Sequence, residues 1–408
     1  MTDQNTQQKE QMINRAEHSF YKTYNRFPVI FQSGKGVYLY DSEGTQYLDF
    51  GAGIAVLALG YSDPEFNTVI KDQMDQLIHI SNLFYNQPSI SAAEKLLQVS
   101  EMERVFFTNS GTEAIEGAIK IAKRYAFDKG MAPDYEIIAM KHSFHGRSLG
   151  ALSVTGNDHY QQPFAPLIPN IKFADFNDLD SVNALFNEKT CAVIMETIQG
   201  EGGIYPASKE FLTGVRDLCD RHEALLILDE IQCGMGRTGK MFAWQHYGVR
   251  PDVMTVAKAL GNGMPVGAFL ASGAAAKAMV PGDHGTTYGG NPLVCAAAET
   301  VLNIYEKREI LKHVGEIAPY LEKKLKELAA KYDIIKEWRG AGLIQGLEFT
   351  IPTADLVRNA LLREKLVLIG AGSHVIRFVP PLVIETADAD LMITKLEAAI
   401  NYTMQEAE

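Results

Sequence analysis

Cysteine is scarce in this chain, and its few cysteines have no metal-binding or redox spacing. The 408 residues include four cysteines, at positions 191, 219, 233 and 295. No two of them form a CxxC pair, so the sequence indicates neither a zinc site nor a dithiol redox centre. Cys191 and Cys219 lie in apolar or helical surroundings, and we expect them to be reduced packing residues. A reducing compartment, the cytoplasm, fits this usage.

The chain also lacks a long apolar run and an excess of basic residues. No stretch approaches the roughly 18 apolar residues of a membrane helix, and the polar residues 1–17 contain no signal-peptide core. The 38 basic and 50 acidic side chains give a net charge of −12. This balance argues against a nucleic-acid partner, and we expect no membrane partner either. Local arginines can still bind anionic substrates.

The apolar pattern predicts an α/β fold. Short, nearly continuous apolar runs alternate with amphipathic stretches, which is typical of a mostly parallel sheet covered on both faces. We expect strands at 105–108, 136–140, 191–197, 224–229, 253–257 and 266–272, with helices at 112–125 and 209–222.

The length and a change of pattern after residue 292 predict more than one domain, because 408 residues exceed what one hydrophobic core usually serves. Residues 61–292 would form a large α/β domain, and residues 293–408 a smaller α+β domain with a last helix at about 388–404. Residues 36–49 alternate like a hairpin. We expect the N-terminal segment, residues 1–60, to pack with the small domain.

Two of the expected strands end in a charged residue. Lys258 follows the run 253–257, and Asp229 closes the run 224–228. Burying a lone charge costs several kcal/mol unless a partner offsets it. A desolvated lysine has a lowered pKa and becomes an amine nucleophile, and a buried aspartate suits a cation such as a protonated pyridine nitrogen. Taken singly, either residue could instead be an exposed strand end.

The segment 109–113, Asn-Ser-Gly-Thr-Glu, lies between an expected strand and an expected helix. Ser110 and Glu113 have the spacing of a capping box, which specifies the helix start. Gly111 allows a ligand to approach the backbone closely, and the first-turn N–H groups of Gly111 and Thr112 favour an anion such as a phosphate. An ordinary capped helix is the alternative.

Other loops carry residues suited to binding. Phe144 could stack on a flat ring, and Arg147 could hold a carboxylate through two hydrogen bonds. His142 and His145 in the same loop have no nearby carboxylate pair, so we expect no metal site. Glu201 lies among three glycines at 200–203.

Two further features are polar groups in unusual settings. The glycine-rich loop 284–292 offers the hydroxyls of Thr286 and Thr287 to a phosphate or a substrate. Arg377 stands inside an apolar strand, where an arginine requires an anionic partner.

Residues 234–239 match GxGxxG, the fingerprint of dinucleotide-binding proteins. That fingerprint requires a following helix and an acidic residue about 20 residues later. Here a short aromatic stretch follows, and Asp252 comes too early. A nicotinamide-dependent oxidoreductase is therefore an alternative function that this segment favours only weakly.

The order and spacing of these segments resemble the class III (subgroup II) aminotransferases, which are pyridoxal-phosphate enzymes of fold type I. The resemblance runs along nearly the whole chain. The matching stretches are 109–113, 144–147, 200–203, 229–239, 258–263 and 285–292. Residues 23–29 and 51–56 look most like the acetylornithine aminotransferases.

The resemblance implies a pyridoxal phosphate site. Lys258 would bond covalently to the cofactor and carry the proton that moves during the reaction, and Asp229 would keep the ring nitrogen protonated. The other cofactor contacts would come from Ser110, Gly111, Thr112, Phe144, Gln232 and, across the interface of a homodimer, Thr287.

The resemblance also implies two substrates in one site. Arg147, with Thr286 nearby, would bind a substrate carboxylate. Arg377 would bind the α-carboxylate of glutamate or 2-oxoglutarate, and Glu201 would pair with Arg377 while the amine donor is bound.

The implied reaction moves the terminal amino group of N-acetylornithine to 2-oxoglutarate in a ping-pong cycle that belongs to arginine biosynthesis. Ornithine δ-aminotransferase, 4-aminobutyrate aminotransferase and succinyl-diaminopimelate aminotransferase share the same motifs and stay open. A non-catalytic relative that keeps the fold for binding is disfavoured, because that use would require neither Lys258 nor Asp229.

Overall fold

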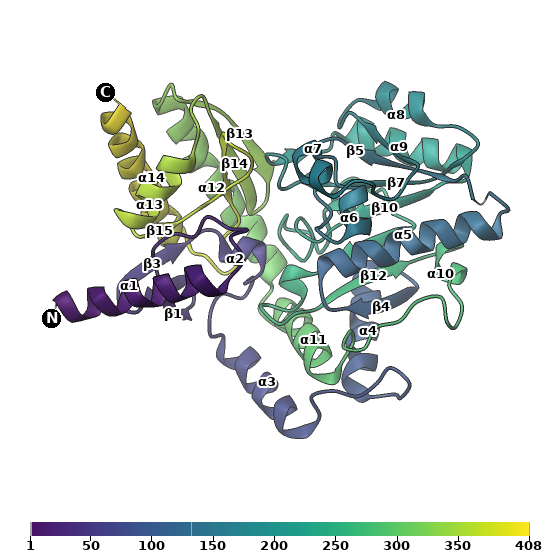
Figure 1. Cartoon of the computed structure of the whole chain (residues 1–408), viewed down its shortest axis with the longest axis horizontal. Helices are drawn as coiled ribbons and strands as arrows, with labels where there is room; N and C mark the ends of the chain where they lie inside the picture. The colour runs from purple at the N-terminus through teal and green to yellow at the C-terminus, as the bar shows by residue number, and fades with distance from the viewer. Residues whose placement is uncertain (1, 132, 408) are drawn as a thin grey trace.

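A seven-stranded sheet forms the centre of the larger lobe in the computed structural model, which describes residues 2–131 and 133–407 (Figure 1). Its strand order is β4-β12-β11-β10-β7-β5-β6. The strands are β4 (Arg104–Thr108), β5 (Glu136–Met140), β6 (Ile171–Ala174), β7 (Thr190–Glu196), β10 (Leu225–Asp229), β11 (Val253–Val256) and β12 (Gly267–Ala271). Only β12 runs antiparallel to its neighbours in this sheet. The predicted mostly parallel α/β sheet is confirmed.

Helices cover both faces of this sheet, which explains the continuous apolar character of its strands. Ile137 and Ala139 of β5 belong to a buried cluster with α5 (Gly111–Asp128). Ile138 and Met140 point to the opposite core, which contains residues of α9 (Lys209–His222) and α11 (Pro292–Lys307). Because successive side chains of a strand alternate between faces, a strand buried on both sides must be apolar at every position.

Two four-stranded sheets form the smaller lobe, at the left of Figure 1. One has the order β13-β14-β17-β16 and the other the order β1-β2-β3-β15. Their strands are β1 (Phe31–Lys35), β2 (Tyr38–Asp41), β3 (Gln46–Asp49), β13 (Ile335–Ala341), β14 (Ile344–Phe349), β15 (Leu366–Val367), β16 (Ile369–Gly370) and β17 (Val375–Phe378). Leu366 of β15 pairs with Leu48 of β3, so the two ends of the chain share one sheet.

Helices α12 (Ile310–Lys331), α13 (Ala354–Leu362) and α14 (Thr386–Ala407) complete the smaller lobe. The other elements are α1 (Thr2–Ser19), α2 (Ala52–Ala55), α3 (Pro64–Gln76), α4 (Gln87–Ser100), α6 (Leu149–Ser153), α7 (Asp158–Gln161), α8 (Leu179–Leu185), α10 (Ala275–Ala278), the short strands β8 (Ile198–Gln199) and β9 (Tyr205–Pro206), and the 3₁₀ turns η1 (Gln162–Phe164), η2 (Ala243–His246) and η3 (Lys258–Leu260). No described helix is both long and apolar enough to cross a membrane.

The carboxyl ends of six strands, all except β12, meet at one edge of the large sheet. Because β4 and β11 are both antiparallel to β12, they run in the same direction as β10, β7, β5 and β6. Ligands of open α/β sheets bind in the crevice outside this edge. Asp229 ends β10, Glu196 ends β7, and Lys258 follows β11, so the fold gathers their side chains at the same place.

Candidate active site

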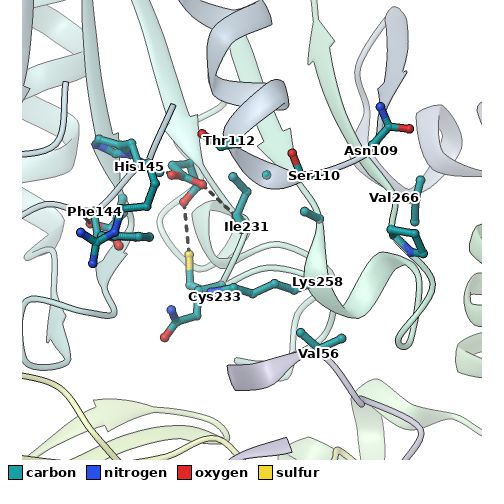
Figure 2. A pocket seen from close by; sticks show the side chains of 18 of the residues that line it. Val56, Asn109, Ser110, Thr112, Phe144, His145, Ile231, Cys233, Lys258 and Val266 are labelled. Carbon is teal, nitrogen blue, oxygen red and sulfur yellow. Dashed lines mark hydrogen bonds and ion pairs between the residues drawn. The ribbon is translucent and has the colours of Figure 1, made fainter. Parts of the chain in front are cut away.

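A cavity of about 430 Å³ lies at the carboxyl edge of the large sheet. Figure 2 shows Ser110 and Thr112 at the start of a helix, Phe144 and His145 on one side, and Lys258 across from them. Eight of the predicted site residues line this cavity, namely Ser110, Gly111, Thr112, Phe144, Arg147, Asp229, Gln232 and Lys258. Four others do not line it, namely Glu201, Thr286, Thr287 and Arg377.

Lys258 begins the 3₁₀ turn η3, one residue after β11. Its φ of 47° is in the left-handed region, which costs a side-chain-bearing residue about 1–2 kcal/mol and is often found at functional sites. Burial lowers the pKa of Lys258 to about 8, and Arg377 acts in the same direction, while Glu201 and Asp229 oppose the shift. The amine is therefore much closer to its neutral, nucleophilic form than a solvated lysine is.

Asp229 is buried at the end of β10, and its carboxylate is held by three donors. Oδ1 accepts hydrogen bonds from the Ile231 N–H at 3.0 Å and from the Thr255 hydroxyl at 3.1 Å. Oδ2 is 2.7 Å from Nδ1 of His145. A carboxylate has about four acceptor positions, so one position on Oδ2 stays available for a further donor in the cavity.

His145 is a site residue that the sequence interpretation missed. Burial opposes a charge on its ring, but the hydrogen bond to Asp229 raises the pKa of His145 above its ordinary value. The ring is fully buried, and Nε2 has no partner among the described residues. The sequence placed it beside Phe144 and Arg147, but only the neighbouring positions of β5 and β10 across β7 bring it to Asp229.

Glu196 is a second buried acid of this site that the sequence did not single out. Its two oxygens accept the N–H groups of Phe144 and Gly200, each at 3.1 Å. Burial raises the pKa of Glu196 to about 7. The carboxyl group thus ties the loop of Phe144 to the glycine-rich loop that carries Glu201.

The start of α5 has the predicted Ser110 cap, but Glu113 bonds Asn109 instead of the Ser110 N–H that a full capping box requires. The Ser110 hydroxyl accepts the N–H of Glu113 at 3.3 Å, and Glu113 accepts the backbone and side-chain N–H groups of Asn109 at 2.7 and 2.9 Å. The N–H groups of Gly111 and Thr112 belong to the first turn, whose donors have no partner within a helix. They lie at the cavity wall, where an anion would meet them.

Glu201 and Arg377 form an ion pair beside the cavity. Nη1 of Arg377 donates to Glu201 at 2.6 Å and to the side-chain oxygen of Gln232 at 2.8 Å. Burial alone would raise the pKa of Glu201, but Arg377 outweighs it, and the pKa lies below its ordinary value. Since Gln232 lines the cavity, it connects this ion pair to the cavity wall.

The structure does not bring Thr286 and Thr287 into the cavity of their own chain. Thr287 is exposed, and the Thr286 hydroxyl accepts the N–H of Gly289 at 3.1 Å. The loop is held by Asn82, whose side-chain amide donates to the Gly289 carbonyl at 2.9 Å. Neither threonine therefore lines the cavity in which a cofactor of the same chain would bind.

The GxGxxG segment binds the smaller lobe. Arg237 within it is fully buried and donates to the carbonyls of Leu343 and Pro380, and the short 3₁₀ turn η2 follows. This differs from a dinucleotide site, where a helix start would follow. Across residues 2–131 and 133–407, no group of three or more His, Cys, Asp or Glu residues could hold a metal ion.

Known proteins resemble this chain over nearly its full length. The model of the family "Aminotransferase class-III" matches residues 20–400. The acetylornithine aminotransferase of Clostridium acetobutylicum is 48% identical, over 93% of this chain and 98% of that protein. The acetylornithine aminotransferase of Methanocaldococcus jannaschii is 46% identical, over 95% of this chain and 98% of that protein.

Solved structures agree with the sequence relatives. An N-acetylornithine aminotransferase from Stenotrophomonas maltophilia has a TM-score of 0.83 at 35% identity, covering 97% of this chain and 100% of that chain. An ornithine aminotransferase from Toxoplasma gondii, reported with partial occupancy of pyridoxal phosphate at its active site, has a TM-score of 0.92 at 29% identity, covering 97% of this chain and 95% of that chain. The predicted fold is confirmed, and the chain belongs to the class III aminotransferase family.

Proposed function

We propose that this enzyme transfers the terminal amino group of N-acetylornithine to 2-oxoglutarate with pyridoxal phosphate as cofactor. The products are N-acetylglutamate semialdehyde and glutamate, a step of arginine biosynthesis. The observation that carries the proposal is one cavity that holds Lys258, Asp229 and the start of α5, in a chain 44–48% identical to several acetylornithine aminotransferases. The four buried free cysteines fit a reducing cytoplasm.

The residues of the cavity fit pyridoxal phosphate. The first-turn N–H groups of Gly111 and Thr112 suit its phosphate, and the open acceptor position on Oδ2 of Asp229 suits a protonated ring nitrogen. A side chain at position 111 would press on the Ile231 side chain, whose Cδ1 would be 2.9 Å from an added Cβ. Phe144 lines the same cavity and offers a ring face for stacking.

When bound, pyridoxal phosphate supplies an electron sink for the substrate carbon that loses its proton. Lys258 then holds and moves that proton at Nζ, a task suited to an amine whose pKa is about 8. The Asp229 carboxylate would stabilise the positive charge of the ring nitrogen next to its Oδ2. His145 and Thr255 hold that carboxylate in place. Burial excludes water from these groups and strengthens their interactions.

Arg377 and Glu201 would let one site accept two substrates. While Glu201 neutralises Arg377, the cavity suits the terminal aminomethylene end of the donor, which carries no carboxylate. When the Glu201 carboxylate turns away, Arg377 is free to bind the α-carboxylate of glutamate or 2-oxoglutarate. Arg147 is exposed and would bind the carboxylate of the donor, which Thr286 would approach from a second chain.

The proposed site is completed by a homodimer. Thr287 is exposed in its own chain, and it would reach the cofactor phosphate of the partner subunit. Strongly exposed apolar side chains surround its loop, including Leu83, Tyr85 and Tyr288. Exposed apolar patches of this kind mark protein interfaces.

The proposal is tested by glutamate formation from 2-oxoglutarate with a panel of amine donors. We expect N-acetylornithine to give the highest kcat/KM, above ornithine, 4-aminobutyrate and N-succinyl-diaminopimelate. Lys258→Ala should abolish turnover while Lys240→Ala, outside the cavity, retains it. A higher kcat/KM with another donor of the panel would contradict the proposed substrate, and near-normal turnover of Lys258→Ala would contradict the proposed mechanism.

A further inference from the structure

The guanidinium of Arg147 lies on the ring of Tyr160. The distance from Cζ of Arg147 to the Tyr160 ring centroid is 3.7 Å, whereas the distance to the Phe144 ring centroid is 5.5 Å. In the described part of the chain, no carboxylate forms an ion pair with Arg147. The stack on Tyr160 is therefore the main interaction that holds an otherwise exposed cation.

The Tyr160 ring is itself fixed in place. It belongs to the short helix α7, and the neighbouring Gln161 side chain donates to three carbonyl oxygens at the end of α6, at 2.9–3.3 Å. Phe144 meets the ring edge-on, with 6.3 Å between centroids and 84° between planes. Since Arg147 precedes α6 and Tyr160 is bonded to its end through Gln161, both side chains belong to one structural unit.

A stacked guanidinium is prepared for a carboxylate. Its planar N–H edge stays free when its face is covered, and that edge matches the two oxygens of a carboxylate. Holding the side chain in one geometry before binding removes the entropy cost of ordering it at the moment of binding. Tyr160 is absent from the cavity wall, so its effect on a substrate is exerted through Arg147.

We infer that Tyr160 is a positioning residue that fixes Arg147 for the carboxylate of the amine donor, and so sets the preference for donors that carry one. The inference rests on the proposed function, because it takes Arg147 as the donor's carboxylate ligand. Tyr160 would therefore affect the binding of the donor's carboxylate and leave the chemistry at the distant amine unchanged.

Two donors test this inference, N-acetylornithine and N-acetylputrescine, which is the same molecule without the carboxylate. Tyr160→Leu removes the ring and should raise KM for N-acetylornithine about threefold to tenfold, the range expected of a cation–π contact. Its kcat should change little, and kcat/KM for N-acetylputrescine should stay unchanged. Tyr160→Phe keeps the ring and should restore the wild-type KM.

The outcomes separate the inference from the proposed function. An unchanged KM for N-acetylornithine in Tyr160→Leu would overturn the inference, and so would an equal loss of kcat/KM for both donors, which indicates general damage. Equal use of both donors by the wild-type enzyme would overturn the carboxylate role of Arg147 and the inference with it, while transamination itself stands. A wild-type enzyme inactive with both donors would overturn the proposed substrate, and with it the inference that depends on that substrate.

Discussion

Burial changes what Lys258 can do near neutral pH. A solvated lysine has a pKa near 10.5, whereas burial and the nearby Arg377 lower the pKa of Lys258 to about 8. Only the deprotonated amine is a nucleophile. Its reactivity should therefore rise with pH through about 8 and then level off.

The rate at which the cofactor-free protein takes up pyridoxal phosphate covalently tests this pKa. We expect the rate to rise about tenfold per pH unit below pH 8, because each unit increases the deprotonated fraction tenfold, and to reach a plateau above pH 8 to 9. Stopped-flow absorbance at several pH values measures it. A rate that continues to rise steeply to pH 10 would contradict the lowered pKa.

The Thr112 hydroxyl donates its hydrogen bond to another residue of the protein. The Ser148 hydroxyl donates to Glu116 at 2.5 Å, because a carboxylate can only accept. The contact of 2.8 Å between the Thr112 and Ser148 hydroxyls must then be donated by Thr112. A phosphate at the start of α5 would therefore meet backbone N–H groups at this residue.

Thr112→Val tests this assignment. We expect its Kd for pyridoxal phosphate to rise less than about fivefold, because the lost hydrogen bond to Ser148 contributes about 1 kcal/mol to local order only. Thr112→Ser keeps the hydroxyl and is the matched control. A Kd increase of about a hundredfold, measured by titration of the cofactor-free protein, would show that the hydroxyl holds the phosphate.

Strand ends were predictable residue by residue, but contacts between distant loops were not. The runs that end at Asp229 and Lys258 identify both residues from sequence alone, and the structure brings them to one cavity. His145 was not predictable as the partner of Asp229, since that contact depends on the order of strands in the sheet. The buried state of Glu196 depends on the same order.

At the scale of elements, α5 packs closely on the central sheet through a glycine. A Cβ at Gly117 would lie 2.1 Å from the Phe269 ring of β12, whereas a Cβ at Gly315 of α12 would meet no atom within 4 Å. Alanine substitutions at these two helical glycines therefore distinguish the effect of packing on stability from the effect of helix propensity.

Alanine substitutions at these glycines should have opposite effects. Gly117→Ala should lower the free energy of unfolding by about 1–3 kcal/mol, because overpacking outweighs the better helix propensity. Gly315→Ala should raise it by about 0.5–1 kcal/mol, because only the propensity changes. Denaturant unfolding measures both, and destabilisation of equal size at the two positions would contradict the packing argument.

The elements that the sequence predicted are those with a clear apolar pattern. The helix at Lys209–His222 and the strand at Glu136–Met140 have the predicted bounds. Helix α1 (Thr2–Ser19) was not predicted, because its polar sequence has no apolar face. Strand β6 (Ile171–Ala174) was also missed, since it is only four residues long and contains a lysine.

At the scale of the whole molecule, the segments 77–85 and 286–291 present one apolar patch. Leu83 and Tyr85 are 86% and 97% exposed, and the Tyr288 ring packs against the His79 ring, tilted by 45° with 5.5 Å between ring centroids. We propose that a second copy of the chain covers this patch and brings Thr287 to the partner's cofactor. The boundaries proposed for the domains, at about 60 and 292, leave this patch on the large domain.

Charged substitutions in the patch should separate the subunits. We expect Phe84→Asp combined with Tyr85→Asp to give a monomer with weaker binding of pyridoxal phosphate, because buried charges oppose association and Thr287 is then lost from the site. Phe127→Asp is the control and should stay dimeric. Phe127 lies near the C-terminal end of α5 and is as exposed as Phe84. Sedimentation velocity decides, and a monomeric wild-type protein would contradict the dimer.

The visible absorption of the purified protein, before and after addition of N-acetylornithine without a keto acid, tests the cofactor and the amine donor together. We expect a yellow protein whose band bleaches with N-acetylornithine and changes far more slowly with ornithine or 4-aminobutyrate. A protein that stays colourless with added pyridoxal phosphate would contradict the assignment of the cavity as a pyridoxal phosphate site. A yellow band that N-acetylornithine leaves unchanged would contradict the proposed donor.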